Sequence, residues 1–443
     1  MTDPAAIAQR IIEMVGDRAE AQAIVSSGES ALTRFANSFI HQNVADTTRA
    51  VNVKIAVDGK VAKGTDNRSD DAALGDLVDR TIEAAKLSPA DPQWPGFSPP
   101  AEVTDPGNYD EATATASPEA RAELVEGFVA AADGTDAAGF CDTEVATVAY
   151  TNTEGQTALG RQSRATIDGI HRVGTVAGSG HQTGRGLDDL DGAAVGALAA
   201  ERFAMAADPY DIKPGEYEVV LAPECVATIA VFLAVYGFNG KAVNEGQSFL
   251  QVGEQQFDQS IRMWDDPFAP GALGLGFDGE GTPKQRLDLV NDGVSASAVH
   301  SRKTAAQAGV ETTGHAVPGW DAYGALPTNG IVGGGDTPVE EMIASVDRGL
   351  YVATFNYCRI LDPKSQVVTG LTRNGTFMIE NGAITGAVTN LRFTQSFVAA
   401  FGEGNVLHIG DDRRFADSEF GPGLVQAPSM HLAGWNFTGG AEG

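Results

Sequence analysis

The chain has 443 residues, 42% of them hydrophobic, so it can bury a substantial core and is long enough for two or three domains. Its 59 acidic and 30 basic residues give a formal net charge of -29, which repels phosphate backbones and anionic lipid headgroups and argues against nucleic acid or a membrane surface as a partner. Because the sequence has no apolar run of the roughly 18–20 residues that span a bilayer, no basic signal peptide and only three, widely spaced cysteines, we expect a cytoplasmic protein with reduced thiols.

The first half of the sequence mixes helical and strand-like segments. Apolar residues recur at a spacing of three and four over 5–15 and 69–87, which predicts amphipathic helices. Between them, β-branched and alternating residues predict strands, with a hairpin turn at Asp58-Gly59. Prolines crowd 88–118 and predict an extended crossover. The remaining predicted elements of this half are a helix over 117–133, strands over 140–173 and a helix over 190–208.

The second half opens on a strand-like segment that leads through Pro223 into an uncharged apolar helix at 226–237. After that helix glycines become dense, and short strand patterns between glycine turns predict a barrel or a sandwich. We therefore expect an α+β protein with two domains. The N-terminal α/β domain takes 1–208, and the C-terminal β-rich, barrel-like domain takes 209–443.

Chemistry-bearing residues are sparse. Asp278 and Glu280 stand in "GFDGEGTP"; on a strand they would face the same side and could bind a metal or exchange protons. In a glycine-rich turn the same carboxylates would accept backbone N–H bonds, and we favour this interpretation. No two histidines lie within five residues of each other, so a zinc site would have to assemble from distant residues. Cys358 is the best candidate for a catalytic thiol, but its strand-like surroundings indicate a buried, unreactive one.

Several longer stretches together carry a family resemblance. In the first half the stretch is "RFANSFIHQNVADTTRAVNVKIAVDGKVAKGTDN", and in the second half the stretches are "LAPECVA", "DDPFAPGALGLGFDGEGTPKQRLDLVNDG", "TTGHA", "VVTGLTRNGTFMIENGAITGAV" and "PSMHLAGWNFTGG". Taken in order, they resemble the TldD/PmbA family of modulator-of-gyrase proteins over nearly the whole chain.

The resemblance implies a fold shared by two branches. The TldD branch is a zinc metallopeptidase with HExxxH on a helix and a cysteine ligand near the C-terminus. The TldE (PmbA) branch lacks these ligands, and the two pair as a cytosolic peptidase for unfolded peptides. When the 226–237 helix is laid on the HExxxH helix, the histidine, glutamate and histidine positions fall on Val231, Phe232 and Tyr236. No cysteine follows Cys358, so the region of 414–419 lacks the thiolate as well.

The chain is therefore expected to be a TldE/PmbA-like, zinc-free subunit with no catalytic residue and no metal ligand, and inactive alone. Zinc is expected only in a TldD-like partner with HExxxH. The chain would pair with that paralogue, or with itself, through its N-terminal domain; the substrate would be an unfolded peptide, with Asp278 and Glu280 as candidate groove residues. Two alternatives stay open: a homodimeric peptide-binding or scaffold protein without activity, and an autonomous hydrolase that uses Asp278, Glu280 and Cys358.

Overall fold

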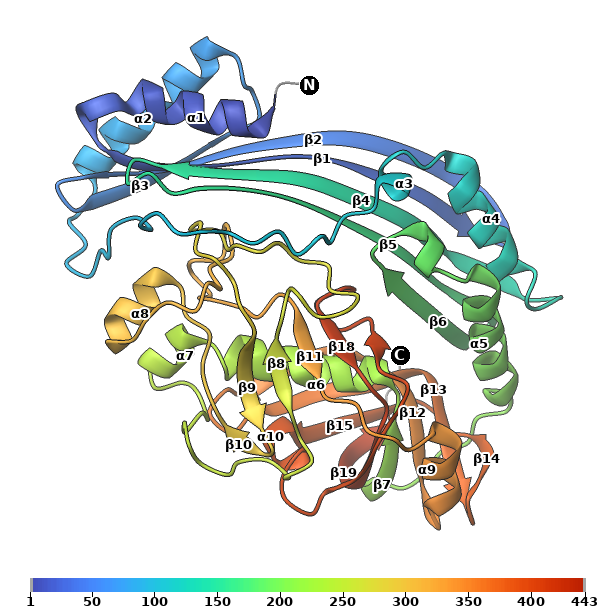
Figure 1. The fold of residues 1–443 in the computed structure, drawn as a ribbon. Helices are drawn as coiled ribbons and strands as arrows, with labels where there is room; N and C mark the ends of the chain where they lie inside the picture. Colours follow the sequence, from blue (N-terminus) through green and yellow to red (C-terminus); the bar gives the residue numbers. More distant parts are fainter. Residues whose placement is uncertain (1–2, 441–443) are drawn as a thin grey trace.

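The computed structural model describes residues 3–440 and has two parts (Figure 1). An N-terminal part combines one large sheet with helices, and a C-terminal part is rich in short and long strands. The fold is thus α+β with an N-terminal α/β part and a C-terminal β-rich part, which confirms the predicted fold class. Within 3–440, no helix is both long and apolar enough to cross a membrane.

The N-terminal sheet is antiparallel, with the strand order β3-β2-β1-β4-β5-β6, and it arches over the C-terminal part (Figure 1). Its strands are β1 (Glu20–Ala36), β2 (Phe39–Val57), β3 (Lys60–Asp66), β4 (Asp136–Asn152), β5 (Thr157–Val173) and β6 (Val176–Gly184). The β2–β3 turn places Asp58 at φ 51° and Gly59 at φ 73°. Two consecutive positive φ angles are what a type I′ hairpin needs, so the Asp-Gly signal locates this turn correctly.

Helices cover the convex face of this sheet at its two ends (Figure 1). They are α1 (Pro4–Val15) and α2 (Asp71–Leu87) at one end and α4 (Pro118–Val129) and α5 (Gly192–Met205) at the other. The predicted spacing gives α1 and α2 one buried face each, and the Asp70 side chain caps α2 by accepting the N–H of Ala73 at 3.0 Å. The proline-rich crossover is extended until α3 (Glu111–Ala114), a single turn that the sequence pattern does not predict.

Five strands of the C-terminal part close into a barrel. They are β12 (Arg348–Asp362), β7 (Gly215–Leu221), β19 (Met430–Gly440), β15 (Leu391–Ser396) and β13 (Val367–Glu380), paired in this order. Because β13 also pairs with β12, the ring is complete. Two more strands, β14 (Ala383–Ala387) and β16 (Val406–Ile409), extend this sheet. The predicted barrel-like architecture is therefore present.

A second, six-stranded sheet is made of short strands from the glycine-rich region. Its order is β10 (Val294–Ser295), β9 (Leu287–Asn291), β8 (Met263–Asp265), β11 (Gly330–Val332), β18 (Val425–Ala427) and β17 (Arg414–Phe415). The helices of this part are α6 (Pro223–Tyr236), α7 (Gly240–Asn244), α8 (Arg302–Ala308), α9 (Val339–Ser345) and α10 (Phe397–Ala400). Helix α6 contacts the barrel strands β12 and β7 and also β18 and β11, so it lies between the two sheets.

Buried charges join the two parts. Glu224, in the first turn of α6, accepts from Arg414 Nη2 at 2.8 Å, and its second oxygen lies 3.8 Å from Nη2 of Arg202 on α5. Burial by itself would raise the pKa of Glu224, but the two guanidinium groups outweigh it and the pKa is lowered. Glu224 is therefore ionised and ties α5 of the N-terminal part to the start of α6.

Replacing Glu224 with glutamine should test this link. The variant Glu224→Gln leaves the buried Arg202 without its counter-charge, and we expect the free energy of unfolding to fall by about 3–5 kcal/mol in a urea titration followed by circular dichroism. The matched control is Glu245→Gln, which removes one partner of an exposed pair with Lys241 and should cost less than about 1 kcal/mol. Equal losses in both variants would contradict the assigned role.

Candidate functional site

Helix α6 forms directly after β7 and, apart from Glu224 in its first turn and Thr228, is apolar around its whole circumference. Pro223 occupies its first turn, where the missing N–H costs no helical bond, and Ala222 provides no side-chain cap. Of its 14 residues only Tyr236 is not fully buried. A helix without a polar face is stable only when neighbours cover every side, as the two sheets do here. The structure begins this helix at Pro223, three residues before the predicted start.

Two of the three positions singled out on this helix, Phe232 and Tyr236, lie in an aromatic cluster. The ring of Phe232 packs against Tyr236, Phe397 and Phe420 at centroid distances of 5.6, 5.7 and 5.6 Å. Val231 and Phe232 are buried and carry no lone-pair donor. Burial raises the pKa of the Tyr236 phenol, so it stays neutral. Zinc needs nitrogen, sulfur or carboxylate ligands, and the residues present at these three positions do not fit a zinc ion.

The segment 414–419 runs beside α6, where the resemblance places the missing thiolate. The N–H of Glu419 donates to Thr228 Oγ1 on α6 at 3.3 Å, and Arg414 contacts Glu224 as described above. The segment presents carboxylates in place of a thiol: burial raises the pKa of Asp417 to about 6, and Glu419 pairs with Arg359 at 3.1 Å. Within 3–440, no three or more His, Cys, Asp or Glu side chains form a group that could hold a metal ion.

Asp278 and Glu280 lie in a turn, which is the interpretation favoured from the sequence; they do not lie on a strand. Asp278 Oδ1 accepts the N–H groups of Glu280 and Thr282, both at 2.9 Å, and Oδ2 accepts that of Ala316 at 2.8 Å. Glu280 points elsewhere, because it accepts the N–H of Arg302 at 2.8 Å and lies 3.4 Å from Lys54 Nζ. The glycines at 279 and 281 let the chain fold back, and the carboxylates bind the backbone that results.

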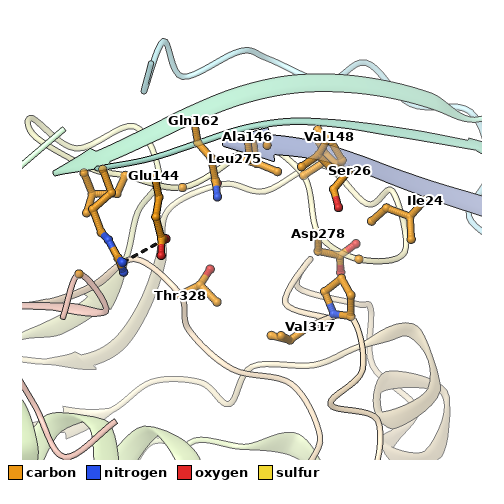
Figure 2. A pocket seen from close by; sticks show the side chains of 18 of the residues that line it. Ile24, Ser26, Glu144, Ala146, Val148, Gln162, Leu275, Asp278, Val317 and Thr328 are labelled. Carbon is orange, nitrogen blue, oxygen red and sulfur yellow. Dashed lines mark ion pairs between the residues drawn. The ribbon is translucent and has the colours of Figure 1, made fainter. Parts of the chain in front are cut away.

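A cavity of about 670 Å³ lies between the concave face of the N-terminal sheet and loops of the C-terminal part (Figure 2). The lining residues labelled in Figure 2 include Ile24, Ser26, Ala146, Val148 and Gln162 from the sheet, and Leu275, Asp278, Val317 and Thr328 from the loops. Glu144 and Arg164 form an ion pair of 3.0 Å on its lining. Of the two candidate groove residues, only Asp278 lines this cavity. Its pKa is raised to about 6, chiefly by burial and then by Glu280.

A buried ionic network forms part of the same wall and was not predicted from the sequence. Asp265 Oδ2 lies 3.1 Å from His315 Nε2 and 3.4 Å from Lys284 Nζ, and Lys284 also donates to Thr328 Oγ1 at 2.8 Å. Burial would raise the pKa of Asp265, but the two neighbours lower it, while burial lowers the pKa of His315. The three residues are far apart in the chain and form no motif. The one sequence signal they share is that each lies in a stretch that carries the family resemblance: Asp265 in "DDP", Lys284 in "GTPK" and His315 in "TTGHA".

The thiols are buried and poor nucleophiles. Burial raises the pKa of Cys141 to about 12 and also raises the pKa values of Cys225 and Cys358. Cys358 lies on β12 with its side chain in the barrel core. Because a thiol must ionise to attack, none of the three is placed for nucleophilic catalysis.

One carboxylate near the cavity should make stability depend on pH. Asp142 on β4 lies 3.7 Å from Arg164 Nη2, and its Oδ1 has no hydrogen-bond partner among the described residues. Burial, aided by Glu144 and opposed by Arg164, raises its pKa to about 6. An aspartate in the unfolded chain ionises near pH 4, so ionised Asp142 destabilises the folded state above pH 6 and not below pH 4.

We expect Asp142→Asn to raise the free energy of unfolding by about 2–3 kcal/mol at pH 7.5, with the gain shrinking toward zero by pH 4. Urea titrations at both pH values measure it. Asp46→Asn, on an exposed part of β2, is the control and should change stability by less than about 0.5 kcal/mol at either pH. A gain independent of pH would show that charge burial is not its cause.

Residues 214–439 match the family model of the PmbA/TldA metallopeptidase C-terminal domain, a match of just over half the chain. The chain is 30% identical over 182 residues to the metalloprotease slr0863 of Synechocystis, a match that covers 39% of this chain and 38% of that protein. It is 26% identical over 257 residues to the metalloprotease PmbA of Escherichia coli O157:H7, covering 57% of this chain and 53% of that protein.

These sequence matches thus span between about a third and a half of the curated relatives' own length. A comparison of structures covers more. The crystal structure of TldE from Thermococcus kodakarensis superposes on 98% of this chain and 99% of its own with a TM-score of 0.84, at 17% sequence identity. At this identity the likeness shows a common fold, including the N-terminal sheet that the family model does not reach.

Proposed function

The chain belongs to the TldD/PmbA metallopeptidase family, and we propose that it is the zinc-free, TldE/PmbA-like subunit of a TldD-type metallopeptidase that acts on unfolded peptides. The observation that carries the proposal is the packing of α6. Val231 and Phe232 stand where the resemblance puts a histidine and the glutamate of the catalytic branch, and both are packed in apolar surroundings. The helix thus keeps its place in the fold without a metal ligand or a base at these positions.

The contribution of such a subunit would be structural. Its arched sheet and C-terminal loops enclose the cavity of Figure 2, whose lining mixes small, polar and apolar side chains. An enclosure of this kind would admit an extended chain and exclude a folded domain. The bond cleavage itself would occur on the TldD-like partner, which is expected to carry the HExxxH helix and the zinc.

The N-terminal sheet offers a surface for that partner. Strand β3 pairs with β2 only at Val51–Val57, so residues 39–50 have β1 on one side and no described strand on the other. Residues 39–48 are exposed, and Phe39 and Val44 are exposed by 58% and 43%. A long exposed edge strand with apolar side chains tends to pair with another strand. We assign this edge to the N-terminal sheet of the partner subunit, whose similar fold would present an equivalent edge for two-fold pairing.

The direct test mixes the chain with an HExxxH-bearing paralogue from its own host. We expect co-elution as a heterodimer and cleavage of a fluorogenic unfolded peptide, with no cleavage by this chain alone. The double variant Phe39→Lys/Val44→Lys should abolish co-elution, because charges on an edge block strand pairing. The control is Leu87→Lys, which changes another side chain that is 87% exposed, at the end of α2, and should keep the complex.

Cleavage by the chain alone would favour the autonomous hydrolase. A stable homodimer that ignores the paralogue and never gains activity would favour the scaffold protein. Pairing that survives the edge variant would leave the subunit role intact and refute only the assigned surface.

Restoring the helix tests how far the site has diverged. Val231→His/Phe232→Glu/Tyr236→His recreates HExxxH, yet we expect weak zinc binding and no efficient peptidase. Two histidines leave the ligand set incomplete, and a glutamate at 232 would face Phe397 and Phe420 at a cost of several kcal/mol, on the order of 2–7 for an uncompensated polar group. Adding Glu419→Cys, in the segment bonded to α6, should tighten zinc binding. Zinc competition with a chelator and peptide cleavage measure both; efficient cleavage by the triple variant would contradict the account.

A further inference from the structure

A second pocket, of about 740 Å³, lies where the two parts of the molecule meet on the side of α5. Its lining comes from the ends of β5 and β6, the end of α5, Asn356 of β12, and the strands β13 and β14 with the loop that follows. These elements lie together in Figure 1, and β13 contacts both β6 and α5. The pocket shares no lining residue with the cavity of Figure 2 and none with α6.

The lining of this pocket is positively charged, although the chain as a whole is negatively charged. The chain has 59 acidic residues, yet no aspartate or glutamate lines the pocket. Two exposed arginines do, Arg172 at the end of β5 and Arg373 on β13. Within 3–440, neither guanidinium has an ion pair; even Asp136, directly across from Arg172 on β4, forms none with it. Two unpaired guanidinium groups on one acid-free wall are suited to an anion.

Neutral polar groups surround the two arginines. Asn356, Asn374 and Asn390 line the pocket, together with the hydroxyl residues Thr175, Thr372, Thr376 and Thr389. The β12–β13 register passes from Val352↔Thr376 to Thr354↔Arg373, so Asn374 and Gly375 form a bulge without ladder partners, at φ 54° and 141°. A bulge leaves backbone groups free to bond to a ligand. Asp211 contacts this wall by accepting a hydrogen bond from Thr389 Oγ1 at 2.7 Å.

We propose that this arginine pocket binds a carboxylate and, on the basis of the proposed function, that the carboxylate is the C-terminus of an unfolded peptide. A guanidinium group binds a carboxylate through two parallel hydrogen bonds, and two such groups favour a full negative charge over a neutral amide. The pocket volume lies within the roughly 300–1,000 Å³ typical of ligand sites. The asparagine amides can form hydrogen bonds with the backbone of the peptide, and the lining residues Ile170, Leu371 and Val388 would contact its apolar side chains.

The test uses the full chain without a partner, so it does not depend on subunit pairing or on catalysis. The probe is a fluorescein-labelled alanine- and leucine-containing hexapeptide, with a free C-terminal carboxylate or with a C-terminal amide, and binding is followed by fluorescence anisotropy. We expect the acid peptide to bind at least about tenfold more tightly than the amide peptide, because only the acid can form a charge-assisted pair of hydrogen bonds with a guanidinium group. Arg172→Gln and Arg373→Gln should each weaken the binding of the acid peptide by about tenfold and leave the binding of the amide peptide unchanged.

Arg34→Gln, at an exposed arginine on β1 outside the pocket, is the matched control and should bind as the wild type does. Because both pocket arginines are exposed, their variants should keep the wild-type circular dichroism and melting temperature. Equal binding of acid and amide, or wild-type binding by both pocket variants, would overturn the proposal. Displacement of the peptide by inorganic phosphate as effectively as by the unlabelled acid would also overturn it, since the pocket would then be a general anion site.

Discussion

The burial of the uncharged stretch of α6 from Val226 to Val235 is the constraint on which the C-terminal part depends. Because α6 has no polar face, exposing any side of it would leave apolar surface in water, and the barrel and the second sheet both pack against it. The same packing decides what the helix can do. Around Phe232 the neighbours are aromatic rings, which suit an apolar core and not the charged ligands of a metal. The stability of the core and the lack of a metal ligand at positions 231 and 232 therefore have one cause.

The two parts are held together by polar contacts that leave a cavity between them. Asn108, in the extended crossover, donates to the carbonyls of Pro267 and Gly274, both at 2.8 Å, and Gln156 donates to that of Gly281 at 2.8 Å. With the contact of Arg202 and Glu224, these bonds join the N-terminal part to the C-terminal part at separate points. A fold joined in this way can enclose a space without filling it with side chains. The proposed role as one half of a peptidase enclosure relies on this property.

Local patterns in the sequence predict the parts of the fold that local physics decides. Helical spacing predicts α1 and α2, and Asp58-Gly59 predicts the hairpin turn, because each depends on neighbours within a few residues. Local patterns alone do not decide between a turn and a strand at Asp278, because acidic residues at alternate positions over only three residues fit both. Contacts such as Arg202 with Glu224, or Asp265 with His315, join residues of distant elements and leave no periodic signal. The arginine pocket could not be predicted from the sequence for the same reason, because Arg172 and Arg373 line one pocket only when the two parts are assembled.

The central claim is that α6 has kept its place in a metallopeptidase fold while holding no metal. The most direct measurement is the zinc content of the purified chain after dialysis, set against protein concentration from amino-acid analysis. The account predicts far less than one zinc per chain, because Val231 and Phe232 supply no ligand and are packed in the core. About one zinc per chain, retained against dialysis, would contradict it and would require a ligand set elsewhere in the molecule.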